Sequence, residues 1–189
     1  MIKIGILGDI GSGKSYVAKH FGCRVFNADA EVSKLYKKDK KIYIKLKKIL
    51  PKYISSFPIN KNEISSAILQ NKSNLKAIIK IVHLEIRKKL NIFLKKNRSE
   101  KIVILDIPLL LENKINKKND ILVFVQSKKI DILKRLKKRK NFNSKLLAKF
   151  KKIQLSLDYK KKKSQFIIKN NFTQKSVMMS VTKILKKIL

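Results

Sequence analysis

Short runs of apolar residues recur along this 189-residue chain. They are rich in isoleucine, valine and leucine, and within them apolar residues mostly follow one another instead of alternating with polar ones. Uninterrupted runs of this length are typical of strands that are buried on both faces, as in a parallel sheet. The predicted strands lie at residues 2–7, 24–26, 102–105, 121–125 and 166–168.

Longer segments with helical spacing of apolar residues separate these predicted strands. The clearest runs from Leu75 to Phe93 over several turns, and Pro51 ends an earlier one at 31–50. Further helices are predicted at 130–136 (Ile130, Leu133, Leu136), at 146–157 and at 177–188. No internal repeat or linker interrupts the alternation of strands and helices. We therefore predict a single α/β domain whose parallel sheet has helices on both faces.

A phosphate-binding loop follows the first predicted strand. Residues 8–15 read GDIGSGKS and fit the pattern G-x-x-x-x-G-K-[ST], with a strand before it and a helix after it. Glycines let successive N–H groups point at phosphate oxygens, and Lys14 adds a charge for the β- and γ-phosphates. The Ser15 hydroxyl can bind Mg²⁺. The predicted nucleoside-triphosphate site comprises Gly8, Gly11, Ser12, Gly13, Lys14, Ser15 and Tyr16.

Asp29 is the first candidate for acid–base chemistry. It follows the second predicted strand, and in an open α/β sheet the carboxyl ends of the strands face the ligand crevice. Asp29 is therefore expected on the same edge as the phosphate loop. It can act as a general base, cap the helix that begins near Ala30, or do both.

Two pairs of basic residues lie four positions apart on predicted helices. His83 and Arg87 share a face beside an apolar stripe, which fits either a substrate site or an amphipathic surface with a chance histidine. Arg135 and Arg139 stand out because nearly all other basic residues are lysines. A planar guanidinium binds phosphate oxygens bidentately, so these two arginines fit a lid that closes on the transferring phosphoryl group. A solvated helical face is the alternative.

The formal net charge is +36, from 48 Lys+Arg against 12 Asp+Glu. Such an excess is typical of nucleic-acid-binding proteins, so an ATPase that acts on nucleic acid is one alternative function. The lysines are dispersed, however, and together with the many isoleucines and asparagines they suggest A/T-rich codon usage. We expect no specific nucleic-acid partner, and at most weak, salt-sensitive RNA binding.

The same composition bears on the compartment. No apolar run reaches the length of a membrane span, and glycines and Asp9 interrupt the N-terminal apolar stretch that a signal peptide would need. The single cysteine, Cys23, cannot form an internal disulfide. We expect a cytoplasmic protein without a membrane partner.

Taken together, the motifs resemble the dephospho-CoA kinase family over nearly the whole chain. The matching segments are the phosphate loop, Asn27-Ala28-Asp29, the Pro-Leu-Leu-x-Glu segment at 108–112, residues 133–154 with both arginines, and residues 166–171. The chain departs from the family pattern at Asn27, Asn62, Leu84 and Phe172, where aspartate, arginine, proline and glycine are usual.

This resemblance implies a P-loop nucleoside triphosphate hydrolase fold with about five parallel strands. The implied core covers about 1–30, 100–130 and 164–189, with a helical substrate-binding region at about 31–99 and a lid at about 131–163. It further implies ATP-dependent phosphorylation of the ribose 3′-hydroxyl of dephospho-CoA, with Mg²⁺ as cofactor, by a monomer. Kinases of the same fold that act on nucleoside monophosphates or shikimate are the nearest alternative.

The resemblance also implies roles for individual residues. Asp29, Lys14 and Arg135 would be catalytic, and Arg139 and Asn170 would bind ATP alongside the phosphate loop. The implied contacts to dephospho-CoA come from Asp29, His83, Arg87, Pro108, Leu109 and Glu112.

Overall fold

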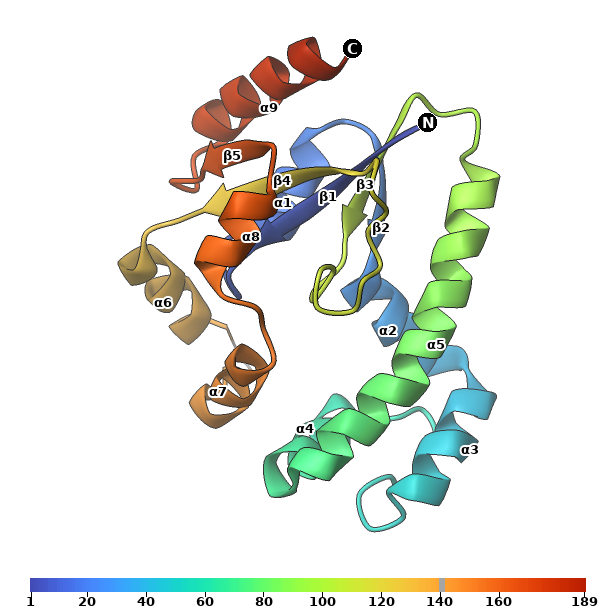
Figure 1. Ribbon diagram of the computed structural model, residues 1–189. Coiled ribbons are helices and arrows are strands. Elements are labelled where there is room, and N and C mark those ends of the chain that lie inside the picture. Colours follow the sequence, from blue (N-terminus) through green and yellow to red (C-terminus); the bar gives the residue numbers. More distant parts are fainter. Residues whose placement is uncertain (140–141) are drawn as a thin grey trace. The chain divides into compact units, whose positions relative to one another are not determined.

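The computed structural model describes residues 1–139 and 142–189, and it contains a five-stranded sheet (Figure 1). The strand order is β2-β3-β1-β4-β5, and every neighbouring pair is parallel. The strands are β1 (Ile2–Gly8), β2 (Arg24–Asn27), β3 (Ile102–Asp106), β4 (Ile121–Gln126) and β5 (Phe166–Lys169). Each predicted apolar run is therefore a strand. β3 is buried at every position because it has a neighbour on each side and layers on both faces.

The chain divides into two compact units. The first, here the sheet unit, comprises Met1–Asn27, Asn97–Asn143 and Phe150–Leu189. The second, here the helical unit, comprises Ala28–Lys96 and Ser144–Lys149. The boundary between Asn27 and Ala28 places Asn27 with the phosphate loop and Asp29 with the helices.

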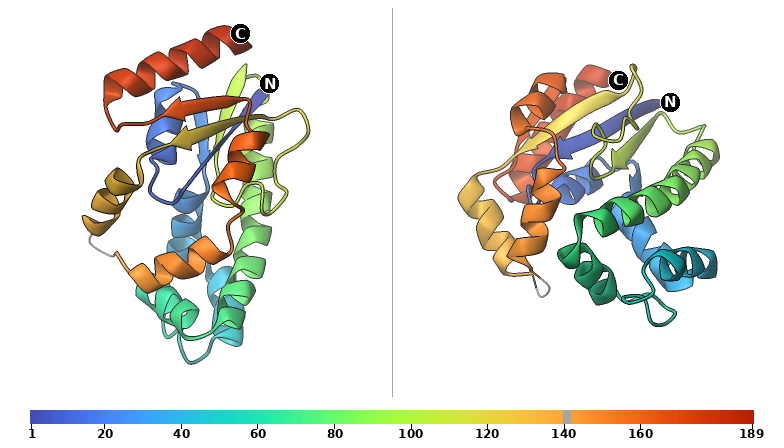
Figure 2. Two further views of the ribbon diagram at one scale, coloured as in Figure 1. Left: turned by 60° about the vertical axis from the view of Figure 1, so that its left-hand side comes forward. Right: turned by 60° about the horizontal axis from the view of Figure 1, so that its bottom comes forward.

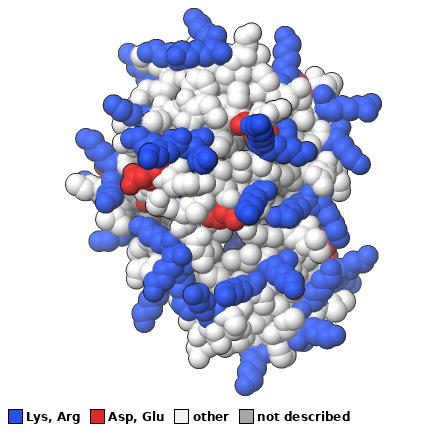
Figure 3. Space-filling view, in the orientation of Figure 1, with Lys and Arg blue, Asp and Glu red and all other residues white. Residues whose placement is uncertain are grey.

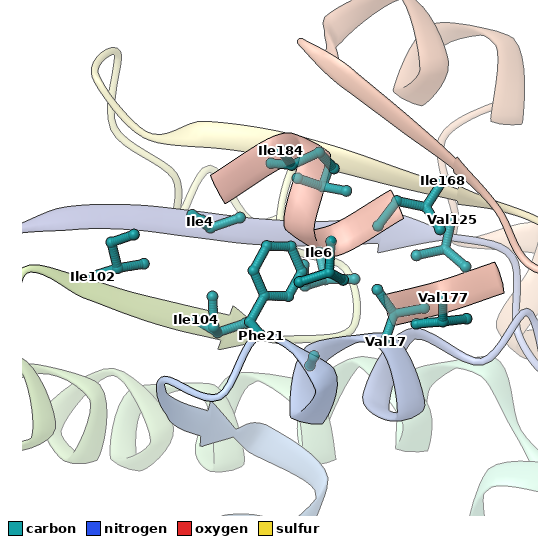
Figure 4. Packing of buried hydrophobic residues seen from close by; sticks show 13 residues of the cluster. Ile4, Ile6, Val17, Phe21, Ile102, Ile104, Val125, Ile168, Val177 and Ile184 are labelled. Carbon is teal, nitrogen blue, oxygen red and sulfur yellow. The ribbon is translucent and has the colours of Figure 1, made fainter. Parts of the chain in front are cut away.

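Helices cover both faces of the sheet. On one face α1 (Lys14–His20) and α9 (Gln174–Ile188) pack on the strands and on each other. Apolar residues from these helices and from the strands together form the main core. Figure 4 labels ten of its residues: Val17, Phe21, Val177, Ile184, Ile4, Ile6, Ile102, Ile104, Val125 and Ile168. On the other face α8 (Leu157–Lys163) packs on β1 and β4. The predicted parallel sheet with helices on both faces is confirmed.

The helical unit is built on α5 (Lys72–Lys96). Its buried residues are Leu75, Ile78, Val82, Ile86 and Leu90, which confirms the predicted helical spacing. α2 (Ala28–Lys38), α3 (Lys40–Ile49) and α4 (Lys61–Gln70) each pack against α5 (Figure 2). The first residues of α7 (Ser144–Lys152) belong to the same unit, where Lys149 Nζ donates to the carbonyls of Ile68 and Leu69 at the end of α4.

Two predicted helices are each divided in two. The helix predicted at 31–50 breaks at Asp39, whose side chain accepts the Ile42 N–H at 3.1 Å and caps α3. The helix predicted at 146–157 is interrupted after Lys152, where α7 ends. Ser156 then caps α8 by accepting the Tyr159 N–H at 3.2 Å. A capping residue turns the chain between two segments that each keep apolar spacing, so spacing alone did not reveal the breaks.

The buried face of α6 (Lys129–Lys137) was predicted correctly at only one of its three residues. Ile130 and Leu133 were expected on its buried stripe, but 66% and 46% of their surfaces are exposed. Leu136 is buried as predicted, but its buried partner is Ile132, on the side of the helix that faces Gly11. The packing of α6 on the phosphate loop selects this face, and such a non-local contact leaves no mark on the spacing.

Basic side chains are scattered over the face shown in Figure 3, among large areas of uncharged surface and a few acidic groups. This distribution agrees with the dispersed lysines of the sequence and shows no single basic stripe on that face. Within the described part of the chain, no helix combines the length and the apolar character needed to cross a membrane.

Candidate active site

The predicted phosphate loop connects β1 to α1, at the carboxyl edge of the sheet. Gly8 and Gly13 have φ angles of 145° and 89°, a region that side chains disfavour. A Cβ atom would lie 2.6 Å from the Val125 carbonyl oxygen at Gly8, and 2.4 Å from Asn170 Nδ2 at Gly13. Both positions therefore require glycine, because the loop backbone lies directly against β4 and Asn170.

Lys14 is folded over this loop. Its Nζ donates to the carbonyl oxygens of Asp9 at 2.8 Å and Gly8 at 3.2 Å. An ammonium group on a flexible stem can exchange such carbonyl partners for phosphate oxygens. The position of Lys14 is thus compatible with the predicted role at a nucleotide's phosphates.

The oxygen donors near the loop are compatible with a Mg²⁺ ion that is bound partly by a nucleotide. They do not form a site made of protein side chains alone. Ser15 is exposed at the start of α1, where its hydroxyl can serve as one ligand. Across residues 1–139 and 142–189, no group of three or more His, Cys, Asp or Glu side chains could hold a metal ion. Mg²⁺ typically takes one or two protein oxygens, substrate phosphates and several waters. A Mg²⁺ ion carried with a nucleotide is therefore compatible with this donor set.

Asn170 holds the phosphate loop in place from the end of β5. Its side chain is buried, Nδ2 donates to the Ser12 carbonyl at 2.9 Å, and Oδ1 accepts the Phe172 N–H at 2.9 Å. Ser127 donates to the same Ser12 carbonyl at 2.9 Å. Both polar atoms of the Asn170 side chain are therefore used within the protein, which favours a positioning role. Direct contact of Asn170 with ATP stays a prediction.

The Pro-Leu-Leu-x-Glu segment lies beside the phosphate loop. A cavity of about 10 Å³ is lined by residues of both, among them Gly8, Lys14, Pro108, Leu109, Glu112 and Lys160. Glu112 Oε1 lies 2.7 Å from Lys160 Nζ, and these side chains are only 9% and 4% exposed. The same oxygen accepts the Leu155 N–H at 3.0 Å. The ion pair thus ties α8 and the chain before it to this segment.

The sequence interpretation gave Lys160 no role because it is one of many dispersed lysines. A usable signal was present, since Lys160 follows Leu157 by three positions and so shares its helical face. The sequence interpretation also gave no role to Asp106, which lies at the end of β3. It is buried, and its carboxylate accepts a hydrogen bond from Asn27 Nδ2 at 2.6 Å.

Three predicted acceptor-side residues belong to the helical unit. Asp29 lies in the first turn of α2, which begins at Ala28, so Asp29 does not precede the helix as the capping interpretation expected. The helix starts earlier because β2 leads into it directly. Asp29 and Arg87 are exposed and His83 is half-buried, the last two on α5. Their predicted roles stay predictions.

The remaining candidates lie in the sheet unit. The Arg135 guanidinium lies 4.2 Å from the centre of the Phe172 ring, and Arg139 is exposed just beyond α6. The Tyr16 ring packs at 4.3 Å from the ring of His20 and against the main core. Burial, followed by the nearby Glu100 carboxylate, raises the pKa of the Cys23 thiol, which keeps that group protonated and unreactive.

The fold and the loop are those of a P-loop nucleoside triphosphate-binding protein. Among solved structures, TT1252 from Thermus thermophilus is similar with a TM-score of 0.81 at 24% identity, covering 100% of this chain and 97% of that one. Dephospho-CoA kinase from Campylobacter jejuni gives 0.64 at 21% identity, covering 98% and 96%. Shikimate kinase from Acinetobacter baumannii, in complex with shikimate, gives 0.53 at 15% identity, covering 100% and 93%.

Sequence comparison identifies the family. The dephospho-CoA kinase family model matches residues 2–176. The dephospho-CoA kinase of Wolbachia pipientis wMel is 34% identical over 183 residues, covering 94% of this chain and 93% of that protein. The Bartonella henselae dephospho-CoA kinase is 31% identical over 191 residues, covering 98% and 97%. The chain belongs to the dephospho-CoA kinase family.

Proposed function

We propose that this protein transfers the γ-phosphoryl group of ATP to the ribose 3′-hydroxyl of dephospho-CoA, giving coenzyme A and ADP in the last step of coenzyme A synthesis. One observation carries the proposal beyond family membership. Residues of the Pro-Leu-Leu-x-Glu segment, Pro108, Leu109 and Glu112, line the same small cavity as Gly8 and Lys14 of the phosphate loop. The segment that resembles this family thus lies beside the phosphate loop, which supports the proposal.

On the ATP side, the backbone of Gly11, Ser12 and Gly13 would face the phosphates, and Lys14 would bind the β- and γ-phosphates. Charge that develops on the transferring group is best stabilised by groups already in place, and Lys14 is held over the loop. Bound Mg²⁺, held by the Ser15 hydroxyl, would neutralise part of the phosphate charge. Arg135 and Arg139, on the predicted lid, are the candidate cations for the transferring group.

On the acceptor side, Asp29 would orient the ribose hydroxyl and accept its proton as the bond to phosphorus forms. The alternative base, the residue at 27, is an asparagine whose amide is engaged with Asp106. Arg87 would supply positive charge to the phosphates of dephospho-CoA, and His83 would add a hydrogen bond. As part of the same proposal, the enzyme is a cytoplasmic monomer without a specific nucleic-acid partner.

A coupled assay of ADP release tests the proposal. The purified protein is supplied with ATP·Mg²⁺ and, in separate reactions, dephospho-CoA, shikimate and each nucleoside monophosphate. Among these acceptors, we expect only dephospho-CoA to cause ADP release. The product should have the mass of coenzyme A and carry a phosphate on the ribose 3′-oxygen. Preferred use of shikimate or a nucleoside monophosphate would contradict the proposed acceptor.

A further inference from the structure

A buried ion pair lies beside the phosphate loop. Glu112 Oε1 is 2.7 Å from Lys160 Nζ, and the two side chains are only 9% and 4% exposed. A buried ion pair usually contributes little net stability, because the cost of removing two charges from water offsets their attraction. Apolar residues of similar volume often serve equally well. Stability alone therefore does not explain why this pair is buried at the edge of the phosphate loop.

One oxygen of the Glu112 carboxylate makes no hydrogen bond within the protein. Oε1 accepts the Leu155 N–H at 3.0 Å in addition to its contact with Lys160. Oε2 is buried, and within residues 1–139 and 142–189 it has no hydrogen-bond partner. Buried polar atoms of native proteins are almost always hydrogen-bonded, so a partner from outside the chain is expected at Oε2.

A water-sized cavity beside the loop has room for such a partner. Its volume is about 10 Å³, and its polar lining includes the side chains of Lys14, Glu112, Gln154 and Lys160. A cavity of roughly 10–15 Å³ can hold one water, which needs about two to four polar partners. The lining supplies that number, and the volume excludes a larger ligand.

Lys14 borders the same cavity from the phosphate loop. Its Nζ donates to the Gly8 carbonyl at 3.2 Å, and Gly8 is another of the lining residues. The Lys14 side chain and the Glu112 side chain therefore share one water-sized space. Opposite charges attract more strongly where little bulk water screens them, so a single water between the ammonium and the carboxylate would couple the two groups.

The segment that carries Glu112 is fixed against the sheet. Leu110 packs on β1 so closely that a Cβ atom at Gly5 would lie 2.5 Å from Leu110 Cδ2. Leu109 has a φ angle of 59°, in the left-handed region that large side chains rarely adopt. Strained residues persist where the surrounding structure fixes them, and they concentrate at functional sites. Glu112 is therefore well placed to orient a more flexible side chain.

We propose that one water in this cavity donates a hydrogen bond to Glu112 Oε2 and links the carboxylate to the Lys14 ammonium, which makes Glu112 a positioning residue for the lysine that binds phosphate. The proposal rests on the proposed function, because it takes ATP as the ligand of Lys14. Lys160 offsets the charge of the carboxylate, so Glu112 orients Lys14 without repelling the phosphates. This role differs from the acceptor contact that the family resemblance implies for Glu112.

A crystal structure of the nucleotide-free protein, at a resolution that shows ordered waters, tests the water directly. We expect one water in the cavity within hydrogen-bond distance of Glu112 Oε2. A cavity without a water would overturn the proposal.

Calorimetric titration of ATP·Mg²⁺ without any acceptor tests the positioning role. The double variant Glu112→Gln/Lys160→Met leaves no charge buried at this site. The glutamine keeps the shape of the side chain and an oxygen for the Leu155 N–H, but it presents an amide NH₂ group to the water in place of an oxygen. Coupling within one network typically amounts to about 2- to 150-fold, so the affinity for ATP should fall by a factor in this range. Unchanged affinity would overturn the proposal.

The ion pair of Lys3 with Asp120 provides a matched control. Lys3 Nζ lies 2.8 Å from Asp120 Oδ1, and Asp120 also accepts a backbone N–H, that of Lys117, at 2.8 Å. Lys3 and Asp120 do not belong to the lining of the cavity. Asp120→Asn/Lys3→Met should therefore leave the affinity for ATP unchanged, and denaturant unfolding of both double variants compares their stabilities.

The same substitutions in a Lys14→Ala protein separate a positioning role from a structural one. If Glu112 acts through Lys14, Glu112→Gln/Lys160→Met should not weaken ATP binding further once Lys14 is removed. An equal fall in both backgrounds would overturn the proposal, because the pair would then only support the loop. Failure of the parent protein to phosphorylate dephospho-CoA would count against the proposed function and leave these binding results intact.

Discussion

The sheet unit and the helical unit hold their candidate residues in different ways. In the sheet unit the residues around the phosphate loop are bonded to one another, as in the contacts of Lys14 with Asp9 and of Asn170 with Ser12. In the helical unit Asp29 and Arg87 are exposed on α2 and α5, whose packing depends on other, apolar residues. Substitutions in the helical unit should therefore affect the acceptor reaction alone, whereas those in the sheet unit should also affect ATP binding or stability.

The largest effect is expected from Asp29→Asn in the helical unit. A carboxylate that takes the proton from an acceptor hydroxyl typically contributes roughly 10²- to 10⁴-fold to the rate. The variant should lose most transfer to dephospho-CoA while keeping its melting temperature and its ATP affinity. All three quantities are measured on the same preparation.

Glu31→Gln is the matched control for Asp29→Asn, since Glu31 is the other acidic residue in the first turn of α2. It removes a similar charge from the positive end of the helix and should leave turnover near the parental value. Near-parental turnover in Asp29→Asn, with a small loss of stability, would mean that Asp29 only stabilises the helix.

Lys160→Met should produce the next largest effect, on stability. It leaves the Glu112 carboxylate buried without its partner at 2.7 Å. Breaking a buried ion pair from one side typically costs about 3–5 kcal/mol of unfolding free energy. The exposed neighbour Lys161 provides the control, because Lys161→Met should change the free energy of unfolding little. Denaturant unfolding of both variants is the measurement, and equal stabilities would show that the ion pair is unimportant.

Lys14→Ala, in the sheet unit, should lower both the turnover and the affinity for ATP. Removing a group that stabilises developing charge typically lowers turnover by about 10²- to 10³-fold. Because Lys14 also faces ATP before transfer, ATP affinity should fall as well, unlike in Asp29→Asn. Lys19, exposed on the same helix, is the control, and Lys19→Ala should behave as the parent does. Parental turnover in Lys14→Ala would refute the assignment of the phosphate loop.

The features that the sequence predicted are those encoded over short stretches of chain. The phosphate loop is one example, because its glycines, lysine and serine lie within residues 8–15 and the strand and helix around it are adjacent. The strands are another, because burial on both faces requires continuous apolar residues. α5 was equally clear from the spacing of its buried side.

The features that the sequence did not predict depend on contacts between distant segments. Asn170 meets the loop at Ser12, and Lys160 meets Glu112, through folding of the chain that no local pattern records. The buried face of α6 is likewise chosen by its contact with Gly11. Phe172 stood out in the sequence only as a departure from the family's usual glycine, and no local pattern predicts the contact of its ring with the Arg135 guanidinium.

The smallest effect is expected from Arg135→Lys. This variant distinguishes a role in phosphoryl transfer from a role in ATP binding for a residue of the sheet unit. The sequence places Arg135 at the transferring phosphoryl group, which predicts a fall in turnover greater than any loss of ATP binding. Its contact with the Phe172 ring, which lies beside Gly13 of the phosphate loop, favours a role in ATP binding instead, and a lysine there keeps the charge but loses the flat surface. Cation–π contacts are worth about 0.5–2 kcal/mol, so KM for ATP should rise by roughly 2- to 30-fold at nearly constant turnover. Arg139→Lys serves as the comparison, since Arg139 is the remaining lid candidate for the phosphoryl group and should lower turnover more than it raises KM. If Arg135→Lys lowered turnover and left KM unchanged, Arg135 would belong to the transfer step and its contact with Phe172 would not matter for ATP binding.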